Sequence, residues 1–197
     1  MTVKINADTS NGLQLESDTS GAIDIQSAGV TKASIDTVGN LDIQGRYSGN
    51  GNVPAFSVEL TSDQTGISDA TDTKVGFDSV ETQQGVTFDT TNNRFTVPSG
   101  AGGLYYFSST IQVRSETNSD LVSINMYLFK NGVKNQTNPW NFSTSYVRLF
   151  NMNISKILSL SEGDYIEIYA YLNTAGAGSS RSFKAGGSNF SGFKLIT

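Results

Sequence analysis

The chain has 197 residues, of which 20 are glycine and 16% are charged, and its formal net charge is −5 at pH 7. It shows no cluster of Lys and Arg, so nucleic acid is excluded as a partner, because phosphate binding needs concentrated positive charge. The chain contains no cysteine and no histidine. Disulfides, zinc-thiolate sites and every catalytic arrangement built on Cys or His are therefore excluded as well.

Carboxylate pairs are the catalytic arrangement that this composition leaves open. The acidic residues stand singly in turn sequences, where Asp is favoured for its hydrogen bonds to the backbone; examples are Asp63, Asp69, Asp72 and Asp78. We therefore predict a protein that is not an enzyme. The N-terminus lacks the apolar core of a signal peptide and no segment has the length of a membrane span, so we expect neither export by such a signal nor membrane insertion.

Residues 1–50 repeat a short phrase, a turn residue followed by alternating aliphatic and polar positions. The copies are residues 12–16, 21–26 and 39–44, with a weaker copy at 27–36. Each copy predicts one short strand, which is too small to make a core within one chain. A flexible Ser/Thr/Gly linker is one interpretation. The regular Leu and Ile pairs favour the other, a thin β shaft in which the strands of sister chains intertwine.

Residues 46–54 predict a joint, because they combine Gly and Asn steps with a proline. Evenly spaced strand candidates fill the second region, residues 54–197; they are residues 55–60, 74–80, 86–89, 94–97, 103–114, 121–130, 145–161, 164–173 and 189–196. Asn131-Gly132 predicts a hairpin turn, since both residue types accept positive φ. Many short strands separated by such turns predict an all-β fold, a two-sheet sandwich or jelly roll.

Three of the strand candidates carry aromatic side chains on the face that should point to water. These residues are Tyr106, Tyr127, Phe129, Tyr165, Tyr169 and Tyr171. A free antiparallel sheet normally has one polar face, although a single tyrosine tolerates half-exposure. Six aromatic residues on three strands favour burial against another copy of the chain, so we take them as the candidate self-association interface.

Two segments, residues 133–146 and 173–188, are predicted to be contact loops. The candidate contact residues are Trp140, Asn141, Arg181 and Lys184. The ring of Trp140 suits stacking on a sugar, but a lone Trp also serves as a packing anchor. We expect Arg181 and Lys184 to lie in a solvated loop, and the Gly and Ser content of residues 174–180 indicates mobility.

The second region resembles the complement C1q-like globular domain, which shares its jelly-roll fold with tumour necrosis factor. The resemblance is carried by spaced aromatics, Phe77, Phe88 and Phe95, that lead to Gly-Leu-Tyr-Tyr-Phe at residues 103–107. Further matches are residues 55–58, 128–132, 158–164 and 188–193. Gln83, where the family has Asn or Asp, and two extra residues within 98–102 depart from the pattern. Both departures fall in turns.

This resemblance implies a homotrimer that binds ligands through its surface loops. Some members of the family hold calcium near the trimer axis. Calcium is therefore possible here, but its ligands cannot be placed, because Asp residues scattered in turns are a weak signal.

Residues 11–21 and 36–41 resemble shaft segments of bacteriophage fibre proteins. This second resemblance implies a virion structural protein on the particle exterior, made in the host cytoplasm. Its N-terminal shaft would attach to other virion proteins, and its trimeric head would bind a host cell-surface glycan or protein. A capsid or neck decoration protein that stabilises the particle is one alternative. A secreted C1q-like lectin is another, against which the missing leader and the missing collagen repeats count.

Overall fold

The computed structural model describes residues 22–43, 53–117, 119–176 and 180–195. The chain divides into two units, Met1–Gly51 and Asn52–Thr197, and we call the second unit the head. Among the described residues, no helix has the length and hydrophobicity needed to cross a membrane.

The described part of the first unit is a small antiparallel sheet of order β1-β2-β3, formed by β1 (Ile23–Ser27), β2 (Val30–Ile35) and β3 (Leu41–Ile43). The described parts of the predicted phrases at 21–26, 27–36 and 39–44 thus contain strands, whereas residues 21 and 44 and the phrase at 12–16 lie outside the described residues. Ile25 and Leu41 are 59% and 63% exposed, respectively. Pairing within one chain therefore leaves these aliphatic side chains uncovered, and the intertwined shaft stays a prediction.

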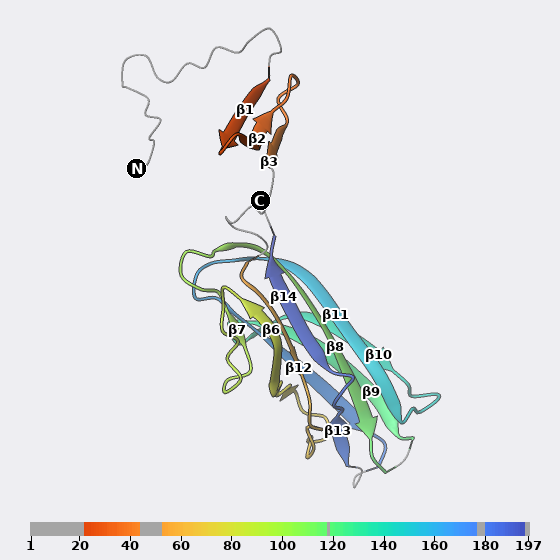
Figure 1. Ribbon diagram of the computed structural model, residues 1–197. Helices are drawn as coiled ribbons and strands as arrows, with labels where there is room; N and C mark the ends of the chain where they lie inside the picture. The colour runs from red at the N-terminus through yellow and green to blue at the C-terminus, as the bar shows by residue number, and fades with distance from the viewer. Residues whose placement is uncertain (1–21, 44–52, 118, 177–179, 196–197) are drawn as a thin grey trace. The chain divides into compact units, whose positions relative to one another are not determined.

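The head is a sandwich of two antiparallel sheets (Figure 1). The five-stranded sheet has the order β10-β9-β12-β5, with β7 also paired to β12, and the six-stranded sheet has the order β11-β8-β14-β4-β6, with β13 also paired to β8. The strands are β4 (Ala55–Glu59), β5 (Thr73–Lys74), β6 (Ser79–Gln84), β7 (Phe95–Thr96), β8 (Gly103–Ser115), β9 (Leu121–Lys130), β10 (Val133–Asn141), β11 (Leu149–Leu160), β12 (Tyr165–Thr174), β13 (Arg181–Phe183) and β14 (Asn189–Lys194). The predicted all-β class is confirmed.

Strand alternation places the core between the two sheets. On β12, the side chains of Ile166, Ile168, Ala170 and Leu172 are at most 1% exposed. The six-stranded sheet supplies aromatic rings to the same core: Phe56 stacks on Phe95 at 5.0 Å and meets the edge of Phe190 at 4.9 Å between centroids. Such offset and edge-on ring contacts stabilise a core beyond the area that they bury.

The turn at Asn131-Gly132 joins β9 to β10, as predicted, and both residues have positive φ, 53° and 74°. The Asn131 side chain donates a hydrogen bond to Asp164 at 2.7 Å and accepts one from the Tyr165 amide at 2.8 Å. Bonds from Lys130, Asn131 and the Ser161 amide to Asp164 lower the pKa of this carboxyl to about 2. The hairpin is thereby fixed to the start of β12.

Four segments of the head differ from the sequence prediction. Residues 86–89 form only one bridge, between Asp89 and Arg94, and the predicted strand 74–80 is interrupted at 75–78 between β5 and β6. The predicted loops 133–146 and 173–188 contain β10 and β13. These two strands were missed because their backbones pair with β9 and β8 although their own side chains lack an aliphatic alternation.

Candidate binding surfaces

The six predicted interface aromatics lie on two different sheets. Tyr127 and Phe129 on β9 and Tyr165, Tyr169 and Tyr171 on β12 belong to the five-stranded sheet, on the positions that alternate with its core residues. Tyr106 lies on β8 of the six-stranded sheet. The outer faces of the two sheets point to opposite sides of the sandwich, so the six residues cannot form one continuous surface. The sequence did not separate them, because alternation does not reveal that β8 pairs with β11 and β14 instead of β9. Their place in a subunit interface stays a prediction.

The outer face of the five-stranded sheet is covered in part by cations of the same chain. The Lys134 ammonium lies 3.6 Å from the ring centroid of Tyr127, which is only 5% exposed. Phe129 stacks on Tyr169 at 4.3 Å, and Lys74 lies 5.6 Å from the Tyr169 ring. A cation above an aromatic face is attracted by the ring quadrupole. The burial of Tyr127 and the half-burial of Phe129 and Tyr169 therefore do not require a second copy of the chain.

Both lysines of this face are neutralised by carboxylates. Lys134 pairs with Asp72 at 2.9 Å, and Lys74 pairs with Glu167, which is 5% exposed. Partial burial is the largest single influence and would lower the pKa of Lys74, but the hydrogen bond and charge of Glu167, together with Tyr169, outweigh it and raise that pKa. This face consequently presents packed rings and matched charges.

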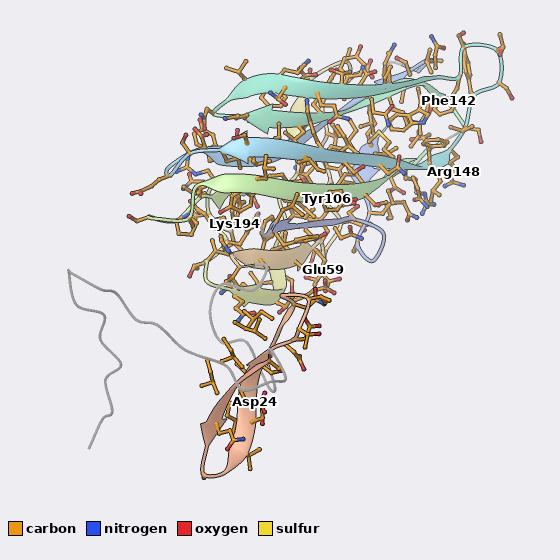
Figure 2. The ribbon with its side chains drawn as sticks, turned by 90° about the horizontal axis from the view of Figure 1, so that it is seen from above. Asp24, Glu59, Tyr106, Phe142, Arg148 and Lys194 are labelled. Atoms are coloured by element: carbon orange, nitrogen blue, oxygen red, sulfur yellow. The ribbon has the colours of Figure 1, made fainter. Side chains whose placement is uncertain are left out.

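The outer face of the six-stranded sheet has the opposite character. Its register places Ile157, Tyr106, Phe193 and Ala55 in one row across β11, β8, β14 and β4. The rings of Tyr106 and Phe193 lie 5.6 Å apart, and Ile157 is 56% exposed. Figure 2 labels Tyr106 on β8, beside β11. This row is a partly exposed apolar stripe, which we call the Ile157 row.

Sequence reasoning missed Ile157, although a signal for it was present. The three outward positions of β11 directly before it, Asn151, Asn153 and Ser155, are polar, and Ile157 interrupts that series. Leu149 on β11 and Leu104 on β8 are also exposed, by 47% and 38%. Leu104 lies beside the Ile157 row, because its neighbour Tyr106 pairs with Ile157, whereas Asn151, Asn153 and Ser155 separate Leu149 from it. Exposed apolar patches mark interaction sites.

A polar hollow of about 370 Å³ lies where β10 meets β11 and β8. Its polar lining comes from Tyr106, Ser108, Gln136, Asn138, Asn153 and Ser155, and Ile154 completes it. Asn138 donates a hydrogen bond to the Asn153 carbonyl at 2.9 Å, which joins the edge strands of the two sheets. The hollow therefore offers hydroxyl and carboxamide groups without a charged side chain among its lining residues.

Arg181 is buried, which corrects the expectation that it lies in a solvated loop. Its exposed fraction is 7%, and its guanidinium pairs with Asp69 at 2.9 Å. It also donates to the Thr174 hydroxyl at 3.1 Å and the Ile67 carbonyl at 3.2 Å. The pairing of β13 with β8 turns this side chain inward, so we do not retain Arg181 as a receptor-contact residue.

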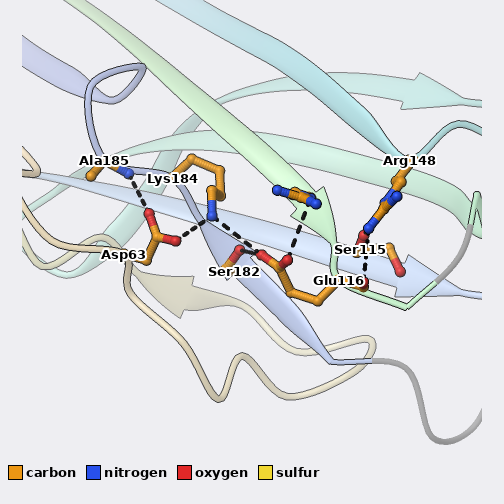
Figure 3. Close-up of polar contacts among 8 residues, drawn as sticks. Asp63, Ser115, Glu116, Arg148, Ser182, Lys184 and Ala185 are labelled. Carbon is orange, nitrogen blue, oxygen red and sulfur yellow. Dashed lines mark hydrogen bonds and ion pairs between the residues drawn. The ribbon is translucent and has the colours of Figure 1, made fainter.

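Lys184 is likewise held in a network, shown in Figure 3, in which it bridges Asp63 and Glu116. The hydrogen bond from Lys184 holds the pKa of Asp63 below its usual range, and the bond from the Ser182 hydroxyl does the same for Glu116. The side chain of Lys184 is 18% exposed. This network connects the segment after β4 to the end of β8. Lys184 is therefore held by ion pairs and does not lie in the solvated loop that the sequence predicted.

Trp140 is half-buried and packs edge-on against Phe150, with centroids 5.7 Å apart. Phe142 lies against the same Phe150 ring at 5.0 Å. Of the two roles considered for Trp140, the structure supports the packing anchor. Asn141 is exposed, and its side chain accepts a hydrogen bond from the Ser143 amide at 2.8 Å. Tyr146, 46% exposed, lies in the loop that follows.

The described residues contain no group of three or more acidic side chains placed to hold a metal ion. Within these residues the structure therefore offers no side-chain cluster to which the calcium considered from the sequence can be assigned.

Taken together, two antiparallel sheets around a cluster of Phe rings define the head as a β-sandwich domain. A family model, the C1q domain, matches residues 55–195, and the chain belongs to this family. C1q globular domains are typically non-enzymatic and typically trimerise.

Among solved structures, the chain is similar to the globular domain of the zebrafish complement 1qA protein. The identity is 20% and the TM-score 0.50, and the match covers 73% of this chain and 98% of that domain. A likeness at this identity shows the fold. The comparison with curated proteins finds no match.

Proposed function

We propose that the chain is the subunit of a homotrimeric fibre-type appendage on the exterior of a bacteriophage particle. In this proposal, the N-terminal shaft attaches to other virion proteins and the C1q head binds a host cell-surface glycan or protein. Membership of a family that typically trimerises supports a trimeric head. The repeated Leu and Ile phrases support an intertwined shaft. The observation that carries the assembly is the Ile157 row.

We propose that the trimer interface lies on the outer face of the six-stranded sheet. Complete burial of an Ile side chain stabilises by about 1.5–3 kcal/mol. Because 56% of Ile157 is exposed, its burial in an interface adds about 1–1.5 kcal/mol for each chain. Tyr106 and Phe193 add aromatic contacts of the kind enriched at interface centres. The five-stranded sheet is the weaker choice, since its rings are covered by Lys134 and Lys74.

We propose that the receptor surface lies at the end of the head opposite to Ala55, where the chain enters the head from the first unit. Ala55 pairs with Phe193, so the first and last strands of the head bring the chain in and out at one end. Figure 2 shows Lys194 near that end and Phe142 and Arg148 at the other. Loops presented by a rigid sandwich are common binding sites, and three copies on one head gain affinity through avidity.

The shaft is completed by sister chains. In β1 to β3, Ile25, Val30 and Leu41 are each more than half exposed. Equivalent side chains of two other chains would cover them. This removes apolar area from water, the dominant favourable contribution to association.

Light scattering of the purified chain tests the assembly. We expect a particle of three times the 21.1 kDa of one chain. Ile157→Glu should dissociate it, because a carboxylate would be buried without a partner. Val133→Glu is the matched control, since Val133 is an exposed aliphatic residue on the five-stranded sheet. A stable, well-folded monomer of the unaltered chain contradicts the proposal.

Electron microscopy of intact particles, with an antibody to the head, tests the location. Label at the tail supports the fibre-type appendage, whereas label spread over the shell indicates capsid decoration. Adsorption of the purified head to host cells tests the binding role, and a trimer that adsorbs to no host cell contradicts it.

A further inference from the structure

We infer that Asn131 is a site of spontaneous deamidation, and that the fold holds the reaction back by binding the Asn131 carboxamide to Asp164 and Tyr165. Asn is among the thermolabile residues of proteins. It is most reactive before Gly, because glycine has no Cβ atom to hinder its amide nitrogen and has the widest backbone freedom. The inference concerns bonds within one chain, so it goes beyond the proposed function and does not depend on it.

The reaction has two steps and consumes only water. The backbone nitrogen of Gly132 attacks Cγ of Asn131, a C–N bond closes a succinimide ring, the Cγ–Nδ2 bond breaks, and ammonia leaves with the proton of the Gly132 amide. Water then opens the ring at one of its two carbonyls. Opening at Cγ leaves Asp at position 131. Opening at the backbone carbonyl leaves isoaspartate, in which the main chain runs through the side chain.

Hydrogen bonds fix both ends of the Asn131 carboxamide. Its Nδ2 atom donates to Asp164 at 2.7 Å, and its Oδ1 atom accepts from the Tyr165 amide at 2.8 Å. The backbone is fixed as well, since the Asn131 amide donates to the Tyr165 carbonyl at 2.9 Å. A succinimide forms only when Cγ turns onto the amide nitrogen of the next residue. A carboxamide that is bound at both ends to another segment cannot make this turn until those bonds break.

The turn itself has little room to rearrange. Asn131 and Gly132 both have positive φ, 53° and 74°, as a tight two-residue hairpin turn requires. A Cβ atom built on Gly132 would lie 3.2 Å from the Tyr165 hydroxyl, so this side chain packs closely against the turn. Rotation of the backbone toward the reactive conformation therefore also disturbs the contact with Tyr165.

Asp164 is held in the state that suits this role. It pairs with Lys130 at 2.8 Å and accepts a hydrogen bond from the Ser161 amide at 2.9 Å. Because its pKa is lowered to about 2, at neutral pH it is an ionised acceptor and has no proton to give to the leaving ammonia. Hydrogen bonds to a charged acceptor are stronger than neutral ones. Breaking this bond together with the one from Tyr165 makes the reactive conformation at least about tenfold rarer.

Deamidation would destroy the contact that delayed it. In the Asp product, a carboxylate oxygen replaces the Nδ2 donor and faces Asp164, and Lys130 can neutralise only one of the two carboxylates. In the isoaspartate product, the main chain gains an atom inside the turn, which a two-residue hairpin does not accommodate. β10 is an edge strand that pairs with β9 alone. We therefore expect the start of β10 to loosen after the reaction.

Mass spectrometry of the peptide that contains Asn131 tests the site. The purified chain is kept in warm, mildly alkaline buffer with and without urea, and the mass gain from amide to acid is followed over time. We expect the folded chain to react about tenfold more slowly than the unfolded chain, or slower still. Asp164→Ala should remove most of this protection. Asp78→Ala, which removes a turn carboxylate bound to Thr61 and Ser62, should leave the rate unchanged.

Hydrogen exchange of Asn131→Asp, which has the sequence of one product, tests the consequence. We expect the amides at the start of β10 to exchange faster than in the unaltered chain, while those of β8 keep their protection.

Four results would overturn the inference. They are equal rates in the folded and unfolded chain, no acceleration by Asp164→Ala, equal acceleration by Asp78→Ala, which would place the reaction in the globally unfolded chain, and unchanged protection of β10 in Asn131→Asp. If Asp164→Ala does not fold, the comparison of the unaltered chain with and without urea still decides whether the fold holds the reaction back.

Discussion

Gly192 on β14 is the position at which a single methyl group most directly tests the aromatic core. A Cβ atom built there would lie 2.5 Å from Phe107 Cδ1 and 2.9 Å from Phe56 Cε1. Both distances are shorter than real Cβ contacts. The two rings cannot both retreat, because Phe56 also stacks on Phe95 at 5.0 Å and Phe107 lies 5.6 Å from the same ring.

The expected effect of Gly192→Ala is a net loss of stability. Overpacking a filled core costs about 1–3 kcal/mol, and replacing Gly within a strand returns about 0.5–1 kcal/mol. The difference is a destabilisation of about 1 kcal/mol, and at most about 2.5 kcal/mol. For a domain near 150 residues, this lowers the melting temperature by roughly 2–10 °C.

Thermal and urea unfolding of the purified chain at one fixed concentration measure this effect. Gly76→Ala is the matched control, since the atom nearest to its Cβ is Gln64 Oε1 at an ordinary 3.5 Å. We expect it to be neutral or stabilising by about 0.4–1 kcal/mol. If Gly192→Ala unfolds at or above the temperature of the unaltered chain, β14 does not cross the core as described.

Three further predictions concern the polar contacts. Asp69→Ala leaves the buried Arg181 guanidinium without its ion pair. The free energy of unfolding in urea should fall by about 2 kcal/mol, which is below the range for fully buried pairs because Asp69 is 37% exposed. Adding Arg181→Met should recover part of this loss, and no recovery would contradict the pairing. Asp164 has its pKa lowered from 3.8 to about 2, so it stabilises the fold above pH 4 and this contribution is lost as the pH falls through 2; Asp164→Asn should flatten melting temperature against pH in that window. Lys134→Ala should uncover the Tyr127 ring, measured as stronger acrylamide quenching of tyrosine fluorescence, with a loss of about 0.5–1 kcal/mol; unchanged quenching would refute the stacking.

The strands that sequence reasoning located correctly are those whose own side chains alternate. β9 and β12 place Ile and Leu at every second position toward the core, and the period of two makes such strands visible without a structure. β10 could not be found in this way, because its residues from Lys134 to Trp140 are mostly polar. Its strand conformation depends on the ladder with β9 and on the turn at Asn131-Gly132.

The candidate surfaces were less accessible to sequence reasoning than the core. Alternation separates the two faces of a strand but does not say which strands are neighbours, so Tyr106 was grouped with Tyr127 although they lie on different sheets. The cation that covers Tyr127 is paired with Asp72, more than fifty positions away in the sequence. The polar hollow is lined by Gln136, which follows a bulge at Asn135, and a one-residue insertion in a ladder leaves no mark in the hydrophobic pattern.

Because Ala55 pairs with Phe193, the chain enters and leaves the head at neighbouring positions, and the head can be exchanged as one unit. Its two ends leave on adjacent strands, so an exchange bounded near these residues would move the complete sandwich while the surfaces at the far end stay intact. If the head binds a receptor as proposed, recombination at these boundaries would exchange its specificity in one genetic event. The same boundaries are the natural places to graft the module onto a designed trimeric support.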